Sequence, residues 1–385
     1  MNRIRQIIAV AAVSIVAAGG LAACSSNSNS NESAKSTTST GVPAEPATKP
    51  DRLVIRIWSG DEQKVYADTA GKKFTEDTGI PIVWDTTDEA VSYAKLNQEI
   101  SSGQRPSADA SFNAQQRAYT NAARGWTIPI NPELAPNLAK VTAETAAPAD
   151  KGDGPWSYVN PYTLTVPFIV RTDKIDPATV RTWNDLFKPE LSQSLAVDSI
   201  YSSTAFGFAQ SLGVDPAKDP PAGMDPVWAD ISKLRPNLAQ LGSNADVVTA
   251  LTNGSVKLAI SNTGSGIQAM NAGAPIALVA PSDGLYVVGD AYYIHKGIPD
   301  ANAYYAQVFA NYLLDPAVQS QVADKLGLIP VNPEATVPAY MSDNKAVFPR
   351  SAEDLAADKA IVAPIPLMAK NDEAWQKAFD GAIGR

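Results

Sequence analysis

Hydrophobic and polar positions change period repeatedly along the chain after residue 51. Short apolar runs alternate with longer segments in which apolar residues recur at helical spacing before a glycine. The runs predict strands at 52–58, 81–87 and 108–113, and the longer segments predict helices at 61–79, 91–103 and 115–125. The order strand, helix, strand, helix, strand indicates a mostly parallel sheet with helices on both faces.

A second series of the same kind follows. It predicts strands at 164–172, 194–200 and 257–263 and helical segments at 182–187, 202–212, 227–238, 246–254 and 265–273. The tail 303–327 carries two helical patterns separated by Asp315 and Pro316, and no internal repeat has a fixed period. The sequence therefore predicts an α/β protein, and a chain of this length is expected to form two lobes.

The first 23 residues have the parts of a secretory signal peptide, namely two arginines, an apolar stretch at 7–23 and small residues at its end. The alternative, a membrane-spanning helix, would use a stretch at the lower limit of length that a Gly-Gly pair interrupts. The stretch ends in Leu-Ala-Ala before Cys24, which matches the bacterial lipobox. Acylation of Cys24 would supply the two chains that stable anchoring requires. We predict that Cys24 anchors the exported protein to the outer face of the cell membrane.

The composition predicts a disordered segment and excludes disulfides, thiolate metal sites and some classes of partner. Residues 24–50 are rich in Ser, Thr, Asn, Pro and Ala, which predicts a disordered tether. Cys24 is the only cysteine, so neither disulfides nor thiolate metal sites hold the folded part together. The formal net charge of −9 argues against nucleic acid and against a basic membrane-binding face.

Signals for catalysis are weak. The only histidine, His295, has no cysteine or obvious carboxylate motif near it in the sequence. Residues 342–344 read Ser-Asp-Asn as in serine β-lactamases, but the S-x-x-K and K-T-G motifs of that class are missing. No P-loop, paired metal ligands or dinucleotide fingerprint occurs. We expect no enzyme, no cofactor and no metal, and a cell-surface hydrolase is the alternative from a different class. The alternating pattern speaks against a β-rich adhesin.

Four segments resemble periplasmic polyamine-binding proteins and their relatives. They are FTEDTGI at 74–80, TWNDLFKPELSQSLAV at 182–197, the long stretch 251–297 that contains AGAPIALVAPSDG, and NYLLDPAVQSQVADKLGLIPVNPEA at 311–335. The resemblance implies a type 2 solute-binding protein of an ABC importer, with two α/β lobes that close on a small ligand. It implies a first lobe at 51–162 and 283–385, a second lobe at 163–282, and hinge strands near 162–165 and 280–284. The implied partners are a permease and an ATPase subunit, and the protein is expected to be a monomer.

Candidate ligand contacts follow from the rule that ligands bind beyond the carboxyl ends of strands in open α/β sheets. Trp58 follows the first strand and could stack on a ligand or pack in the core. The helix starts at 202–204 and 263–265 offer hydroxyls and free N–H groups, which suit acidic oxygens but also serve ordinary capping. The resemblance adds Asp290 and one of two adjacent tyrosines on the returning strand. The predicted contacts are Trp58, Ser59, Asn113, Gln115, Ser202, Ser203, Thr204, Thr263, Ser265, Asp290 and Tyr292.

The ligand itself is left open by the sequence. Polyamine binders of the family hold each ammonium with a carboxylate and enclose the methylene chain between aromatic rings. Here Ser199, Ile200 and Ser203 stand where the family tends to be acidic, and Ser261 stands where it shows tryptophan. We therefore favour a small polar solute with an acidic group, with spermidine or putrescine as the alternative. Ferric iron is less expected, because the adjacent tyrosines 292 and 293 of a strand point to opposite faces.

Overall fold

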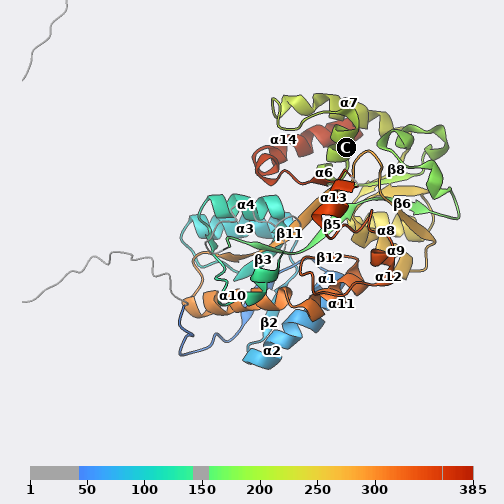
Figure 1. Ribbon diagram of the computed structural model, residues 1–385. Helices are drawn as coiled ribbons and strands as arrows, with labels where there is room; N and C mark the ends of the chain where they lie inside the picture. The colour runs from blue at the N-terminus through green and yellow to red at the C-terminus, as the bar shows by residue number, and fades with distance from the viewer. Residues whose placement is uncertain (1–42, 142–155, 358, 385) are drawn as a thin grey trace, which may run out of the picture. The chain divides into compact units, whose positions relative to one another are not determined.

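The computed structural model describes residues 43–141, 156–357 and 359–384, all of which belong to one compact unit. The predicted signal peptide, Cys24 and most of the predicted tether lie outside the described residues. Within them the chain forms two sheets with helices packed against both, so the predicted α/β class is confirmed (Figure 1).

The first sheet runs in the order β12-β5-β11-β3-β1-β2, with β4 and β13 also paired to β11. Strands β1, β2 and β3 are mutually parallel where they pair, whereas β11 is antiparallel to β3 and β5. The strands of this sheet are β1 (Leu53–Arg56), β2 (Ile82–Asp85), β3 (Ala110–Ala114), β4 (Thr127–Ile128), β5 (Val159–Val166), β11 (Tyr286–His295), β12 (Ile329–Pro330) and β13 (Ile361–Val362). The predicted strands at 52–58, 81–87 and 108–113 are thus present.

Helices from both ends of the chain cover this sheet. The predicted helix 61–79 is continuous but passes through a π-helical turn at Ala67–Gly71, between α1 (Asp61–Tyr66) and α2 (Lys72–Thr78). The others are α3 (Glu89–Ser101), α4 (Gln115–Ala123), α10 (Asp300–Leu313) and α11 (Pro316–Leu326). Phe74 and Phe309 meet edge to face in the first core, with ring centroids 5.4 Å apart.

The second sheet runs in the order β10-β6-β9-β7-β8. Its strands are β6 (Phe168–Arg171), β7 (Leu195–Asp198), β8 (Leu238–Gly242), β9 (Leu258–Ile260) and β10 (Ile276–Val279). Its helices are α6 (Tyr201–Leu212), α7 (Asp225–Ile231), α8 (Asn244–Thr252) and α9 (Thr263–Asn271). The predicted segment 182–187 is a 3-10 turn, Trp183–Phe187, rather than an α-helix. Its Trp183 is fully buried in the second core.

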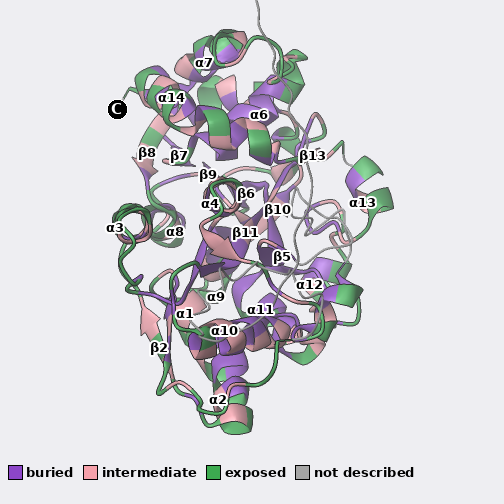
Figure 2. Ribbon diagram, turned by 90° about the vertical axis from the view of Figure 1, so that its left-hand side faces the viewer, coloured by how far each residue is buried: buried purple, intermediate pink, exposed green. Residues whose placement is uncertain are grey.

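Within the described residues the chain passes between the two sheets twice, and a later helix then packs beside the second sheet. It passes from β5 to β6 at Pro167 and from β10 to β11 through 280–285. After β12 it continues through α12 (Ala339–Ser342), α13 (Ala352–Ala357) and β13 to the long helix α14 (Ile365–Ile383). Trp375 and Phe379 of α14 are buried in the second core, and Figure 2 shows this helix beside α6 and α7. The apolar face of α14 thus packs on the helices of the second sheet, and α14 also contacts α4 of the first sheet, while the predicted lobe bounds stay a prediction.

Candidate functional site

Two carboxylates converge on one tyrosine hydroxyl at the carboxyl-end edge of the first sheet. Gly60, with φ 94°, turns the chain after β1 into α1, and this turn places Glu62 in the first turn of the helix. Tyr162 and Asp290 are paired residues of β5 and β11. The Tyr162 hydroxyl lies 2.7 Å from Glu62 Oε1 and 3.1 Å from Asp290 Oδ2. We call these three residues the acidic cluster.

The acidic cluster has no ion-pair partner among the described residues, although the Arg56 charge opposes the rise in the pKa of both carboxyls. Burial raises the pKa of the Glu62 carboxyl to about 7. Burial and then the Glu62 charge raise the pKa of Asp290 well above its usual range. Within the described part of the chain, no lysine, arginine or histidine forms an ion pair with either carboxylate. Tyr162 has a single proton to donate, so two ionised carboxylates here would be stabilised by a cation.

Arg56 is close to the cluster but is held elsewhere. Its guanidinium donates to the carbonyl oxygens of Phe112 at 2.7 Å and Thr87 at 3.2 Å. It also stacks on the Trp58 ring at 5.1 Å from the centroid. Trp58 is half-buried against the first core, and its Nε1 donates to Glu89 Oε2 at 3.2 Å. The ring is thus fixed in orientation but keeps an exposed part, whereas Ser59 beside it is fully exposed.

Glu89 connects Trp58 to the start of α4. Besides the indole, its carboxylate accepts from the Ala114 backbone N–H at 3.1 Å and lies 3.2 Å from Arg117 Nη1. The predicted contacts Asn113 and Gln115 flank this point, and both are buried. Asn113 Nδ2 donates to the Tyr293 hydroxyl at 2.6 Å, so this amide group is engaged within the protein.

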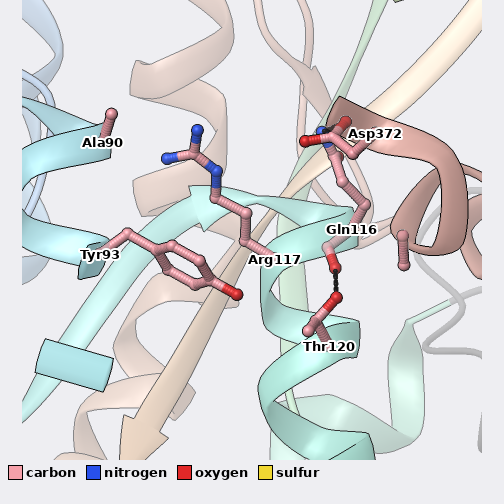
Figure 3. Close-up of a pocket in the computed structure, with 7 residues that line it drawn as sticks. Ala90, Tyr93, Gln116, Arg117, Thr120 and Asp372 are labelled. Carbon is pink, nitrogen blue, oxygen red and sulfur yellow. Dashed lines mark hydrogen bonds between the residues drawn. The ribbon is translucent and has the colours of Figure 1, made fainter. Parts of the chain in front are cut away.

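A pocket of about 270 Å³ opens next to Glu89 between α3, α4 and α14 (Figure 3). We call it the α14 pocket. Gln116 Nε2 donates to Asp372 Oδ1 at 3.4 Å across it, so α4 of the first sheet meets α14 here. The residues that line the pocket are Ala90, Tyr93, Gln116, Arg117, Thr120, Ala369 and Asp372.

The hydroxyl-rich helix starts of the second sheet surround a carboxylate that belongs to the protein. Asp198, at the end of β7, is buried, and its Oδ1 accepts from the Ile200 backbone N–H at 3.0 Å. The Ser203 and Ser261 hydroxyls also bond to this carboxyl, whose pKa burial nevertheless raises to about 7. Ser261 Oγ lies 3.0 Å from Ser265 Oγ. A ligand carboxylate at the start of α6 would therefore meet Asp198.

The remaining predicted residues of this region are buried. Asn262, rather than Thr263 or Ser265, caps α9, because its side chain accepts from the Ser265 backbone N–H at 3.0 Å. Ser202 lies against the Tyr286 hydroxyl. The hydroxyls of Thr204 and Thr263 are buried without a hydrogen-bond partner among the described residues.

Tyr292 and its neighbour point to opposite faces of β11, as predicted. Tyr292 is fully buried in the first core, and its hydroxyl donates to the Ala306 carbonyl at 2.9 Å. Tyr293 packs edge to face on His295, whose Nε2 lies 2.8 Å from Ser111 Oγ. The structure thus places Tyr292 in the core, away from the acidic cluster. Among the described residues, no group of three or more His, Cys, Asp or Glu side chains could hold a metal ion.

The sequence prediction missed Glu62, Tyr162, Glu89, Arg117 and Asp372. Glu62 carried a local signal, since an acidic residue in the first turn after a strand points toward the same edge as Trp58. The other four residues come together only in the folded structure, when the strands have paired and α14 has packed in place.

Comparison with known proteins agrees with this architecture. Residues 69–349 match the family described as bacterial extracellular solute-binding protein. The spermidine/putrescine-binding periplasmic protein of Salmonella typhimurium is 25% identical over 312 residues, which cover 79% of this chain and 82% of the relative.

Solved structures share the fold. The spermidine/putrescine ABC transporter substrate-binding protein PotD from Streptococcus pneumoniae superposes with a TM-score of 0.69 at 19% identity, covering 86% of this chain and 98% of that one. The binding protein MotA from A. tumefaciens B6, in complex with glucopine, gives 0.68 at 18% identity, covering 86% and 99%. None of the described helices has the length and apolar character that crossing a membrane requires.

Proposed function

The chain belongs to the bacterial extracellular solute-binding protein family, and on that premise we propose that it is the receptor of an ABC importer for a small organic amine. The observation that carries the proposal is the acidic cluster. Two carboxylates share one hydroxyl, and an ammonium group would supply the ion-pair partner that neither carboxylate has among the described residues. The ligand charge proposed here is opposite to the one that the sequence favoured.

The chemistry of the cluster supports a primary amine in particular. An ammonium group has three donors, which can reach Glu62, Asp290 and the Tyr162 oxygen together. Charge-assisted hydrogen bonds of this kind are each worth about 1.5–3 kcal/mol. The exposed part of Trp58 supplies an apolar surface nearby, on which a methylene chain could lie. Spermidine and putrescine, the ligands in the names of the relatives, fit this description.

Binding of putrescine tests the proposal. We expect putrescine to raise the melting temperature of the purified protein, because a ligand that binds only the folded state stabilises it. Glu62→Gln and Asp290→Asn should each weaken binding roughly ten- to a hundredfold. Asp61→Asn, a change to the exposed neighbour of Glu62, is the matched control and should leave binding unchanged. Stabilisation by small carboxylic acids but by no amine would refute the proposal.

Anchoring on the outer face of the membrane completes the proposed role. Lipidated Cys24 and the tether 24–50 would hold the receptor beside its permease and ATPase, which raises its effective concentration there. The protein would act as a monomer, and the crossings at Pro167 and 280–285 would serve as the hinges about which the two parts close on the ligand.

A further inference from the structure

The α14 pocket carries opposite charges on opposite walls. Arg117 projects from α4 and Asp372 from α14, and Figure 3 shows the guanidinium beside the Tyr93 ring while Gln116 reaches the Asp372 carboxylate. No ion pair within 4.0 Å joins Arg117 to Asp372, although both residues line the same pocket. The two charges therefore face the pocket separately.

Arg117 keeps unused donors. Its Nη1 is 3.2 Å from Glu89 Oε1, but this atom is buried without a hydrogen bond of good geometry to any described residue. The guanidinium stacks on the Tyr93 ring at 5.1 Å, which fixes its plane. An arginine whose guanidinium plane is fixed by a stacked ring is suited to bind both oxygens of a carboxylate.

Asp372 is the complementary group. Its carboxylate accepts from Gln116 at 3.4 Å and also bonds to the Tyr201 hydroxyl, and two carboxylate oxygens have capacity for further donors. Burial raises the pKa of Asp372, while the Arg117 charge and the Gln116 hydrogen bond oppose the rise. Ala90 and Ala369, which have small side chains, also line the pocket.

Glu89 places the α14 pocket next to the amine site. One of its oxygens receives the Trp58 indole N–H, and the other faces Arg117. Glu89 thus connects the Trp58 ring with Arg117 of the α14 pocket.

We propose that the α14 pocket receives an amino-acid group of the cargo, with its carboxylate on Arg117 and its α-ammonium on Asp372. The inference rests on the proposed function, since the second amine of such a cargo would occupy the acidic cluster. The substrate class is then a diamino acid or a larger molecule that carries an amino-acid end, rather than a simple diamine.

Putrescine and L-ornithine form a matched pair of probes, because ornithine is putrescine with one added carboxylate. Isothermal titration of the full chain should show tighter binding of ornithine. Arg117→Gln should weaken ornithine binding roughly ten- to a hundredfold and leave putrescine binding within about threefold. Arg117→Lys should restore part of the affinity, since a point charge replaces a planar fork. Arg124→Gln, at the exposed end of α4, removes the same charge and should change neither affinity.

The outcomes separate this inference from the proposed function. Tighter binding of putrescine than of ornithine, with Arg117→Gln silent for both, would overturn the amino-acid subsite and leave the amine receptor intact. An equal loss for both probes in Arg117→Gln and Arg117→Lys would also overturn it, by assigning Arg117 a structural role. Failure of every amine to bind, with Glu62→Gln and Asp290→Asn silent, would overturn the proposed function itself.

Discussion

Amine binding should be linked to proton release from Glu62. With a pKa of about 7, the Glu62 carboxyl holds its proton in roughly ten of eleven molecules at pH 6 and in one of eleven at pH 8. An ammonium ligand binds the ionised form, so affinity for putrescine should rise about tenfold from pH 6 to pH 8. Asp290, whose pKa is raised further, would add to this dependence in the same direction.

Titration calorimetry in two buffers of different ionisation enthalpy measures both the affinity for putrescine and the number of protons released on binding. At pH 6 the wild type should release close to one proton per putrescine bound, and Glu62→Gln should lower this number. The only histidine does not interfere, because burial lowers the pKa of His295 to about 3. Asp198 also has a pKa of about 7, so Asp198→Asn is the control, and it should release as many protons on binding putrescine as the wild type does. Affinity that stays flat between pH 6 and pH 8, or an unchanged linkage in Glu62→Gln, would refute the reasoning.

Three further predictions concern stability and anchoring. The pKa of Asp198 is raised above its unfolded value, so the stability that this group contributes is complete below about pH 4 and is lost as the pH rises through 7. In urea unfolding, the free energy of unfolding of the wild type should fall by about 3 kcal/mol between pH 5 and pH 8, and Asp198→Asn should not show this fall. Gly207→Ala would place a Cβ 1.9 Å from the buried Trp183 ring and should lower the free energy of unfolding by about 1–3 kcal/mol or more in the same assay. The control Gly381→Ala places a Cβ that meets nothing within 4 Å, so it should leave stability unchanged or raise it. Cys24→Ser should release the protein from the membrane fraction, and retention of a processed form would contradict the lipid anchor.

Much of the fold could be predicted because its elements carry local signals. The strands of both sheets are apolar runs, and most helices end at glycines that were legible in the sequence. Strand β8 was missed, since Leu-Ala-Gln-Leu-Gly lacks the β-branched residues on which strand prediction depends. Helix α14 was missed although Met368, Trp375 and Phe379 recur at helical spacing, so the sequence did carry a local signal for it.

The candidate site was harder to predict than the fold. Trp58 was predicted because it follows the first strand, and Asp290 because the resemblance implies ligand contacts on the returning strand. Tyr162 and Glu62 are 100 residues apart and meet only once β5 has paired with β11 and α1 has packed beside them. The serines at the start of α6 were predicted to bind an acidic group of the ligand, and in the structure the Ser203 hydroxyl bonds to the Asp198 carboxyl of the protein itself.

The position of α14 fixes the order in which the protein can become complete during synthesis. The first core needs side chains as far along as Val331, and the second needs those of α14 as far along as Ile383. Until α14 has emerged, Phe206 and Tyr201 lack the Trp375 ring that packs on both of them. A ribosome-bound chain therefore cannot finish its second core before α14 has been synthesised and has left the ribosome. We propose that this protein is exported across a membrane, and the delay keeps the chain incompletely folded, which is the form that a translocation channel can pass.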